Sequence, residues 1–212
     1  MKSRSLREYF EKLHATSADP WSLETSSYER KKYKRTLNVL NYRRYRRALE
    51  VGSSIGVFTA MLAPLCDEVL AVDISQTAVA VAKERLEEFP HVQIERRTLP
   101  EETPEGPFDL IVVSEVLYYW PRNVVLAALQ RFEEILIPDG VLLAVHHRNY
   151  ELTWRRRIVE EIRPPFLRQW MLRNRLLKGG DELHELLLEQ LNLTNTIRLI
   201  EPAYRLDLFE KK

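Results

Sequence analysis

The sequence predicts a doubly wound α/β fold, in which helices cover both faces of a mostly parallel sheet. Short apolar strands alternate with amphipathic helices from Arg47 onward, which is the order of βαβ units. The strand expected at Asp109–Val113 is almost wholly apolar, as in the middle of a parallel sheet that is covered on both faces. The last two expected strands, Asn195–Ile200 and Tyr204–Phe209, are separated by three residues, so an antiparallel hairpin is expected to close the sheet.

Bulk composition is that of an ordinary globular protein. The 212 residues suffice for one α/β domain with a substantial core, and the formal net charge of +1 gives no global attraction to nucleic acid or acidic membranes. The single cysteine, Cys66, excludes a disulfide framework and fits a reducing compartment. We see no signal peptide and no apolar run of the roughly 18 residues that span a bilayer. We expect a soluble, cytoplasmic protein, either a monomer or a homodimer.

The N-terminal region is expected to form a helical cap. The first helix is expected over Leu6–Leu13. Asp19-Pro20-Trp21 is interpreted as a turn, because proline disfavours helix in the residue before it. Ser26 or Ser27 is a suitable N-cap for a second helix over Tyr28–Leu40.

The sheet region and the C-terminal region follow the cap. The expected elements, in chain order, are strand Arg47–Val51, helix Phe58–Leu65, strand Glu68–Asp73, helix Thr77–Phe89, strand Val92–Arg96, strand Asp109–Val113, helix Arg122–Leu136, a turn at Pro138-Asp139-Gly140, strand Val141–Val145, a basic and aromatic segment Tyr150–Leu177 that breaks at Pro164-Pro165, a loop at Gly179-Gly180 and helix Asp181–Leu191. We expect one domain over residues 1–212, with the cap at 1–44, a ligand-binding core at 45–146, and further helices with the closing strands at 147–212.

The loop after the first strand is the most informative segment. In open α/β sheets, ligands bind at the carboxyl ends of the strands. Gly52 and Gly56 permit a sharp turn and a close approach of the backbone to a ligand. Glu50 lies at the mouth of the strand, where it is placed to meet a cationic group such as an ammonium.

An acidic residue follows the second strand at a matching distance. Asp73 comes twenty-one positions after Gly52, and an acid there accepts hydrogen bonds from both hydroxyls of a bound ribose. A glycine-containing turn alone is usually only a turn, and an Asp after a strand is usually a helix cap. Together, at this spacing, the two features favour a nucleoside-bearing ligand.

The glycine pattern selects among nucleosides. A dinucleotide site prefers G-x-G-x-x-G, but the matching positions here hold Gly52, Ser54 and Val57. The spacing Glu50-x-Gly52-x-Ser54-x-Gly56 resembles instead the signature with which class I methyltransferases bind S-adenosylmethionine (SAM), with Ser54 in place of the middle glycine.

Five segments resemble the nodulation protein S family. They are Asp19-Pro20-Trp21, Ser27-Tyr28-Glu29-Arg30, Thr36-Leu37, Ala48 to Gly56, and Phe108 to Tyr119. The resemblance covers most of the chain up to about Val145. It implies a Rossmann-like class I methyltransferase fold, SAM as cofactor and a small-molecule acceptor. Members of that family N-methylate the amino sugar of a deacetylated chitin oligosaccharide, so the resemblance implies an amine or amino sugar acceptor.

Residues after the fourth strand are expected around the transferred methyl group. Methyl transfer requires alignment of both partners, and an amine acceptor must first lose its proton. In the resembled family the stretch from Ser114 to Tyr119 borders the methionine part of SAM and the acceptor. Glu115 is a candidate anchor or base, or else an exposed acid at a helix start. Tyr118 and Tyr119 either contact the acceptor or the sulfonium, or pack beneath the cleft.

Residues for the rest of the cofactor come from two regions. Ile74, Thr98 and Leu99 are expected beside the adenine, with Ile74 on its face and its edge read by Thr98, the backbone or Glu101. Trp21 and Tyr28 lie in the cap, which either closes over the cofactor as a mobile lid or is simply anchored by these side chains.

Histidines near the C-terminal half supply further candidates. His146 and His147 end the fifth strand and point to opposite sides of it, so at most one faces the cleft. His146 joins Glu115 and Tyr118 as a catalytic candidate, since histidine titrates near neutral pH. His184 lacks the second histidine of a zinc-protease motif and is interpreted as structural or acceptor-facing. No metal site is expected.

The sequence also allows alternatives to N-methylation. O-methylation of a hydroxyl or carboxylate and a non-catalytic SAM-binding regulatory protein stay open. A nicotinamide-dependent oxidoreductase is disfavoured by the glycine pattern and the closing hairpin. The basic runs Arg30-Lys31-Lys32, Arg43-Arg44 and Arg155-Arg156-Arg157 are balanced by acids elsewhere, so no nucleic-acid partner is expected.

Overall fold

A seven-stranded mixed sheet organises the chain, whose computed structural model describes residues 3–41, 43–148 and 179–212. The strands are β1 (Tyr45–Val51), β2 (Cys66–Asp73), β3 (Val92–Arg96), β4 (Phe108–Ser114), β5 (Leu136–His147), β6 (Thr194–Ile200) and β7 (Tyr204–Glu210). The described helices are α1 (Ser3–Thr16), α2 (Ser27–Val39), α3 (Val57–Leu62), α4 (Gln76–Arg85), α5 (Arg122–Ile135) and α8 (Gly180–Gln190), with 3-10 turns η1 (Ala63–Leu65) and η2 (Leu117–Tyr119).

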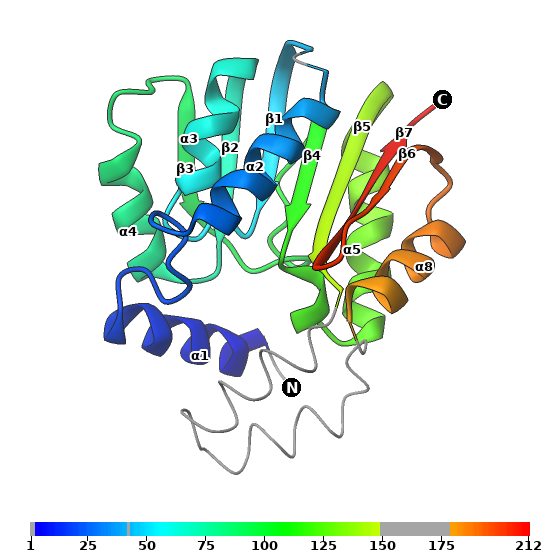
Figure 1. The fold of residues 1–212 in the computed structure, drawn as a ribbon. Coiled ribbons are helices and arrows are strands. Elements are labelled where there is room, and N and C mark those ends of the chain that lie inside the picture. Colours follow the sequence, from blue (N-terminus) through cyan, green and yellow to red (C-terminus); the bar gives the residue numbers. More distant parts are fainter. Residues whose placement is uncertain (1–2, 42, 149–178) are drawn as a thin grey trace.

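The strand order is β3-β2-β1-β4-β5-β7-β6 (Figure 1). Strands β1 to β5 pair in parallel, whereas β7 pairs antiparallel with both β5 and β6. The predicted doubly wound sheet and the closing hairpin are therefore confirmed. The second strand of the hairpin is the inner one, because β7 lies between β5 and β6.

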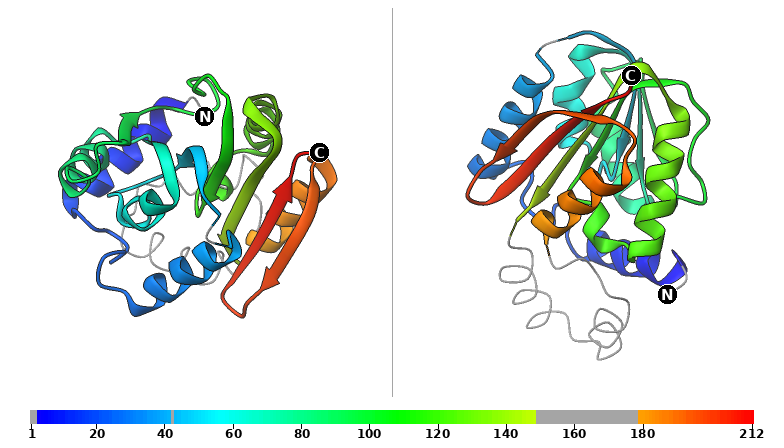
Figure 2. Two further views of the ribbon diagram at one scale, coloured as in Figure 1. Left: turned by 90° about the horizontal axis from the view of Figure 1, so that it is seen from above. Right: turned by 90° about the vertical axis from the view of Figure 1, so that its right-hand side faces the viewer.

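Helices cover both faces of the sheet, and each face has its own apolar core (Figure 2). Helices α5 and α8 pack on the face that carries Ile111 and Val113, and α2, α3 and α4 pack on the face that carries Leu110 and Val112. Because successive strand residues point to opposite faces, β4 contributes side chains to both cores, which explains its unbroken apolar sequence. Helix α1 lies across the carboxyl ends of the strands (Figure 1).

Several expected boundaries differ from the structure, and two differ most. The turn predicted at Pro138-Asp139-Gly140 lies inside β5, which runs on from Leu136. Asp139 has a left-handed backbone (φ 59°), and its N–H donates to the carbonyl of Lys211 at 2.7 Å, so the strand bends without ending. Helix α4 ends at Arg85, four residues before the predicted end at Phe89.

The cap predicted at the start of α2 is present, whereas two other predictions stay open. Ser26 caps α2 by accepting a hydrogen bond from the N–H of Glu29 at 3.2 Å. The segment Tyr150–Leu177 lies outside the described residues, and the division of the chain at 44 and 146 stays a prediction. No helix in the described ranges combines the length and apolar character that crossing a membrane requires.

Candidate functional site

A cavity of about 280 Å³ opens at the carboxyl ends of the parallel strands. Its walls come from α1, α2, the loop after β1, and the ends of β2, β4 and β5. Ligand sites in open α/β sheets occupy this position. We call this cavity the cleft.

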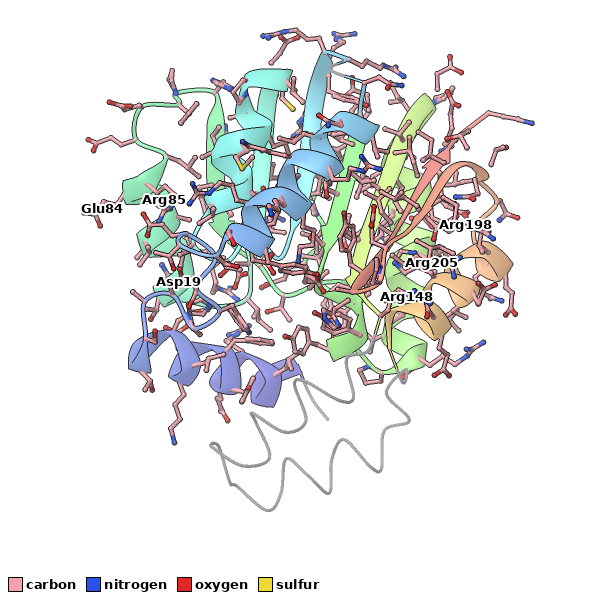
Figure 3. The ribbon with its side chains drawn as sticks, in the orientation of Figure 1. Asp19, Glu84, Arg85, Arg148, Arg198 and Arg205 are labelled. Carbon is pink, nitrogen blue, oxygen red and sulfur yellow. The ribbon has the colours of Figure 1, made fainter. Side chains whose placement is uncertain are left out.

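The loop between β1 and α3 forms the expected tight turn. Gly52 (φ 79°), Ser54 (φ 49°) and Gly56 (φ 76°) all have left-handed backbones. A Cβ on Gly56 would lie 2.9 Å from Leu86 Cδ1, so this glycine is needed for packing behind the loop. Arg85 of α4, labelled in Figure 3, braces the loop by donating from Nε to the carbonyl of Ile55 at 2.9 Å.

Asp73 joins the ends of the first two strands. Its Oδ2 accepts the N–H of Ser54 at 2.9 Å, and its Oδ1 accepts the N–H of Ser75 at 2.9 Å. We call the Ser54–Asp73 hydrogen bond the clasp. Burial raises the pKa of Asp73 in spite of these bonds. The clasp holds the carboxylate at the cleft wall, next to the glycine-containing loop.

Glu50 presents a buried acceptor to the same cleft. Its side chain is buried, and Oε2 has no hydrogen-bond partner among the described residues. Burial and the nearby charge of Asp73 together raise the pKa of Glu50 to about 7, although Thr59 lowers it. A buried carboxylate without a partner is costly, so this group favours a bound cation or proton.

Glu115 is the most heavily bonded acid of the cleft. It has a left-handed backbone (φ 56°), and its carboxylate accepts from Lys32 Nζ at 2.7 Å, from Tyr118 Oη at 2.7 Å and from the N–H of His147 at 2.9 Å. Burial alone would raise its pKa, but the charge of Lys32 and these hydrogen bonds lower the pKa to about 2. Glu115 is therefore a fixed anion near neutral pH.

Lys32 is a site residue that the sequence interpretation missed. Its side chain is buried and also pairs with Glu29 Oε2 at 2.8 Å. Although burial opposes its charge, Glu115 and Glu29 raise the pKa of Lys32. In the sequence it stands in the run Arg30-Lys31-Lys32, which was interpreted only as basic charge balanced by acids elsewhere. The apolar spacing of Tyr33 and Leu37 on α2 is the signal that places it beside the buried face.

Most of the predicted site residues meet at the cleft. Those that line it are Trp21, Glu50, Gly52, Ser54, Asp73, Ile74, Leu99, Ser114, Glu115 and Tyr118. The cleft lining also includes Glu101, which was one of the open possibilities for the adenine edge.

Three of the predicted cofactor residues are not part of the cleft lining. Tyr28 is 38% exposed, and its ring packs edge-on against Tyr204 and lies 5.5 Å from Lys32 Nζ. Gly56 stands behind the loop, against Leu86. Thr98 is buried, and its hydroxyl accepts from Arg7 Nη2 at 2.9 Å.

The position of His146 also differs from the expectation. His146 is fully buried beneath the sheet end and is not part of the cleft lining, whereas His147 lines the cleft. Alternation along β5 turns the two side chains to opposite faces, as expected, but the choice of His146 as the one facing the cleft was wrong. His147 Nδ1 is buried and has no partner among the described residues.

Helix α1 is fastened across the mouth of the cleft. Glu11 accepts from the N–H groups of Gln76 and Thr77 at 2.7 and 3.1 Å, at the start of α4. Phe10 and His14 line the cleft and pack around Trp21, with ring centroids 6.3 and 5.4 Å away. Trp21 therefore belongs to a cover over the cleft, although the structure does not require that cover to move.

Within residues 3–41, 43–148 and 179–212, the acids and histidines form no group of three or more that is placed to hold a metal ion.

The sheet order, the closing antiparallel pair and the cleft at the strand ends define the class I methyltransferase fold. Among solved structures, N-methyltransferase NodS from Bradyrhizobium japonicum WM9, in complex with S-adenosyl-L-homocysteine, matches with a TM-score of 0.76 over 97% of both chains at 24% identity. A putative methyltransferase from Pseudomonas syringae matches with a TM-score of 0.69 and 31% identity, over 88% of this chain and 100% of the other.

Sequence comparison gives the family. Residues 5–155 match the model of Nodulation protein S (NodS), so the chain belongs to the nodulation protein S family. Nodulation protein S of Bradyrhizobium diazoefficiens is 38% identical over 133 residues, which span 59% of this chain and 61% of that one. The protein of the same name from Sinorhizobium fredii is 32% identical over 58% of this chain and 57% of that one. The match thus spans about three fifths of the length of these two relatives.

Proposed function

We propose that this chain transfers a methyl group from SAM to the nitrogen of a small-molecule amine. The observation that carries the proposal is the clasp between Ser54 and Asp73, because it brings the glycine-containing loop and an acid together at the cleft. Bound SAM supplies a methyl group activated by its positive sulfonium. The protein then has to bind the cofactor, align an acceptor and exclude water.

The cleft residues fit the charge and shape of this cofactor. The acidic lining residues are Glu29, Glu50, Asp73, Glu101 and Glu115, whereas the lysine and arginine residues of the lining are Lys32 and Arg97. The partnerless Oε2 of Glu50 is suited to the ammonium of the methionine part, since a charge-assisted hydrogen bond would satisfy it. Asp73 is suited to the ribose hydroxyls, and Ile74 and Leu99 to the adenine.

On the acceptor side we propose Glu115 as an anchor for a cationic group, rather than as a base. An acid with a pKa of about 2 that already accepts three hydrogen bonds is a poor proton acceptor near pH 7. Tyr118 orients its carboxylate. His147 takes the place of His146 as the proposed base, since it lines the cleft and its Nδ1 has no partner among the described residues.

The relatives support an amine or amino sugar as acceptor. The solved structural relative is described as an N-methyltransferase, and the nodulation protein S family model matches residues 5–155, a range that includes the strand ends of the cleft. O-methylation is the second candidate, because an O-methyltransferase of ubiquinone biosynthesis is 28% identical over 166 residues. We also propose that the enzyme acts in the cytoplasm as a monomer or homodimer.

The test is incubation of the purified chain with methyl-labelled SAM and a panel of amines, amino sugars, hydroxyl compounds and carboxylates. We expect label on nitrogen, with Asp73→Ala, whose affinity for SAM should be weakened, as the matched control. Label only on oxygen would replace the proposal with the second candidate. Tight SAM binding without any transfer across the panel would favour a regulatory SAM-binding protein.

A further inference from the structure

A chain of hydrogen bonds runs from β7 to the loop after β4, beneath the cleft. His146 Nε2 accepts the N–H of Leu117 at 3.3 Å. The Nδ1 of His146 lies 3.1 Å from His184 Nε2, and His184 Nδ1 lies 2.6 Å from Asp207 Oδ2. The side chains of His146, His184 and Asp207 are fully buried, and they come from β5, α8 and β7.

One arrangement of protons satisfies this chain. A backbone N–H can only donate, so Nε2 of His146 is unprotonated, and the neutral ring carries its proton on Nδ1. That proton is donated to His184 Nε2, which leaves the proton of His184 on Nδ1, pointing at Asp207. Both rings are neutral in this arrangement, and burial lowers the pKa of each histidine.

Asp207 fixes the direction of the chain. Its Oδ2 also accepts from Arg205 Nε at 2.7 Å, and its Oδ1 accepts from Arg198 Nε at 3.2 Å. Both arginines, labelled in Figure 3, belong to the β6–β7 hairpin. Burial opposes the charge of Asp207, but His184 and Arg205 lower its pKa. Asp207 therefore acts as an ionised acceptor at one end, and the opposite end must be a donor, which is the Leu117 amide.

The Leu117 end of the chain touches the loop that forms the cleft. Glu115, two residues earlier, places its carboxylate in the cleft. Val116 packs against the loop between β1 and α3, since a Cβ added to Gly52 would lie 3.1 Å from Val116 Cβ. A shift of the Leu117 amide would therefore move both Glu115 and the side chain that packs on this loop.

We propose that Asp207, His184 and His146 are positioning residues that hold the loop after β4 in the geometry methyl transfer requires. The burial of these three polar side chains requires an explanation, because apolar side chains could fill the same space without leaving a donor or acceptor unsatisfied. Asp207 sets the tautomer of His184, His184 sets that of His146, and His146 pins the Leu117 amide. The catalytic part of this inference rests on the proposed function, whereas the tautomers belong to the chain itself.

Nitrogen-15 NMR of the histidine rings in the full chain tests the tautomers directly. We expect His146 and His184 to be neutral, each with its proton on Nδ1 and a bare Nε2. His146→Gln and His184→Gln assign the signals. A proton on Nε2 of either ring, or a doubly protonated ring near neutral pH, would overturn the inference whether or not the protein binds SAM.

Variants at His184 test the positioning role. His184→Phe keeps a planar ring but breaks the chain, and we expect kcat to fall about tenfold or more, with a smaller rise in the Kd for SAM because Val116 packs against Gly52. His184→Gln can accept from His146 and donate to Asp207, so it should recover most of kcat. Leu186→Ala, on the same helix and also buried, is the control for lost packing and should keep kcat.

Three results would contradict the role: full kcat in His184→Phe, no recovery in His184→Gln, or an equal loss in Leu186→Ala. Failure of the wild-type chain to bind SAM would refute the proposed function, and the NMR result would still decide the tautomers.

Discussion

Lys32 of α2 and Glu115, the residue after β4, form an ion pair of 2.7 Å although 83 positions separate them in the sequence. The lysine is buried, and the carboxylate receives two further hydrogen bonds, from Tyr118 and His147. The pair ties the N-terminal cap to the acceptor side of the cleft. The pair also keeps Glu115, which the sequence suggested as an anchor or a base, ionised near neutral pH.

Removing the lysine should strongly destabilise the protein. Lys32→Met leaves Glu115 charged and partly buried without its main partner, so we expect the free energy of unfolding to fall by about 3 kcal/mol at pH 7. Urea unfolding measures the change. The double variant Lys32→Met/Glu115→Gln should recover at least half of the loss, because no unpaired charge remains. Additive effects of the two substitutions would show that the pair does not couple.

The ion pair predicts a pH dependence in acid. The pKa of Glu115 is lowered to about 2, so its contribution to stability is present above the unfolded pKa, near 4, and is lost as the pH falls toward 2. Unfolding followed from pH 6 to pH 2 should show a shallower acid loss in Glu115→Gln than in the wild type. Parallel curves would contradict the lowered pKa.

Glu50 predicts a pH dependence of the opposite sign. Its pKa is raised to about 7 in the folded chain, so the ligand-free fold holds an extra proton below that pH, and stability falls as the pH rises from about 4.5 to 7. In Glu50→Gln that fall should disappear from thermal unfolding curves measured between pH 5 and 8.

The affinity for SAM should change with pH in the opposite direction to the stability of the ligand-free chain. A cationic ligand prefers the ionised carboxylate, so affinity is expected to rise from pH 6 to 7.5 in the wild type and to stay flat in Glu50→Gln. Identical pH profiles for the two proteins would show that Glu50 does not meet the cation.

Ser54 and Gly52 form a matched pair of backbone tests. Ser54 carries a left-handed backbone and a buried hydroxyl without a partner among the described residues, so Ser54→Gly should raise the stability by about 0.5–1 kcal/mol. Gly52→Ala should lower it by about 1–3 kcal/mol, because its Cβ would meet Val116 at 3.1 Å and φ is 79°. Denaturant unfolding midpoints measure both changes in stability. A lower stability in Ser54→Gly would contradict backbone strain at Ser54.

His147 should affect turnover more than cofactor binding. We expect His147→Asn to lower kcat about a hundredfold with a protonated amine as acceptor, since general base catalysis contributes roughly 10²–10⁴-fold. The Kd for SAM, measured by calorimetry, should change little. His91→Asn, on the loop before β3 and away from the cleft, serves as the control. An unchanged kcat in His147→Asn would remove His147 as the base.

The sequence was sufficient for the sheet and for much of the cleft, because both follow from local patterns. Apolar runs located the strands, and the glycine spacing with Asp73 located the loop where the cofactor is proposed to bind. The positive φ of Ser54 could not be predicted from the glycine spacing, since serine rarely adopts a left-handed backbone.

The contacts that could not be predicted from the sequence are long-range. Lys32 reaches Glu115 through the packing of α2 beside β4, and no local pattern pairs a lysine in a basic run with a distant acid. His146 and His147 were correctly placed on opposite faces, but the direction depends on where β7 and α8 pack against β5. The role predicted for Tyr28 stays a prediction, and its packing against Tyr204 is another long-range contact that the local sequence pattern does not show.

Titration calorimetry with SAM tests the central claim most directly, with Asp73→Ala and NADH as controls. We expect one-to-one binding of SAM to the wild-type chain, affinity weakened about tenfold or more in Asp73→Ala, and no heat from NADH. Absence of SAM binding, or equal affinity in the wild type and Asp73→Ala, would contradict it.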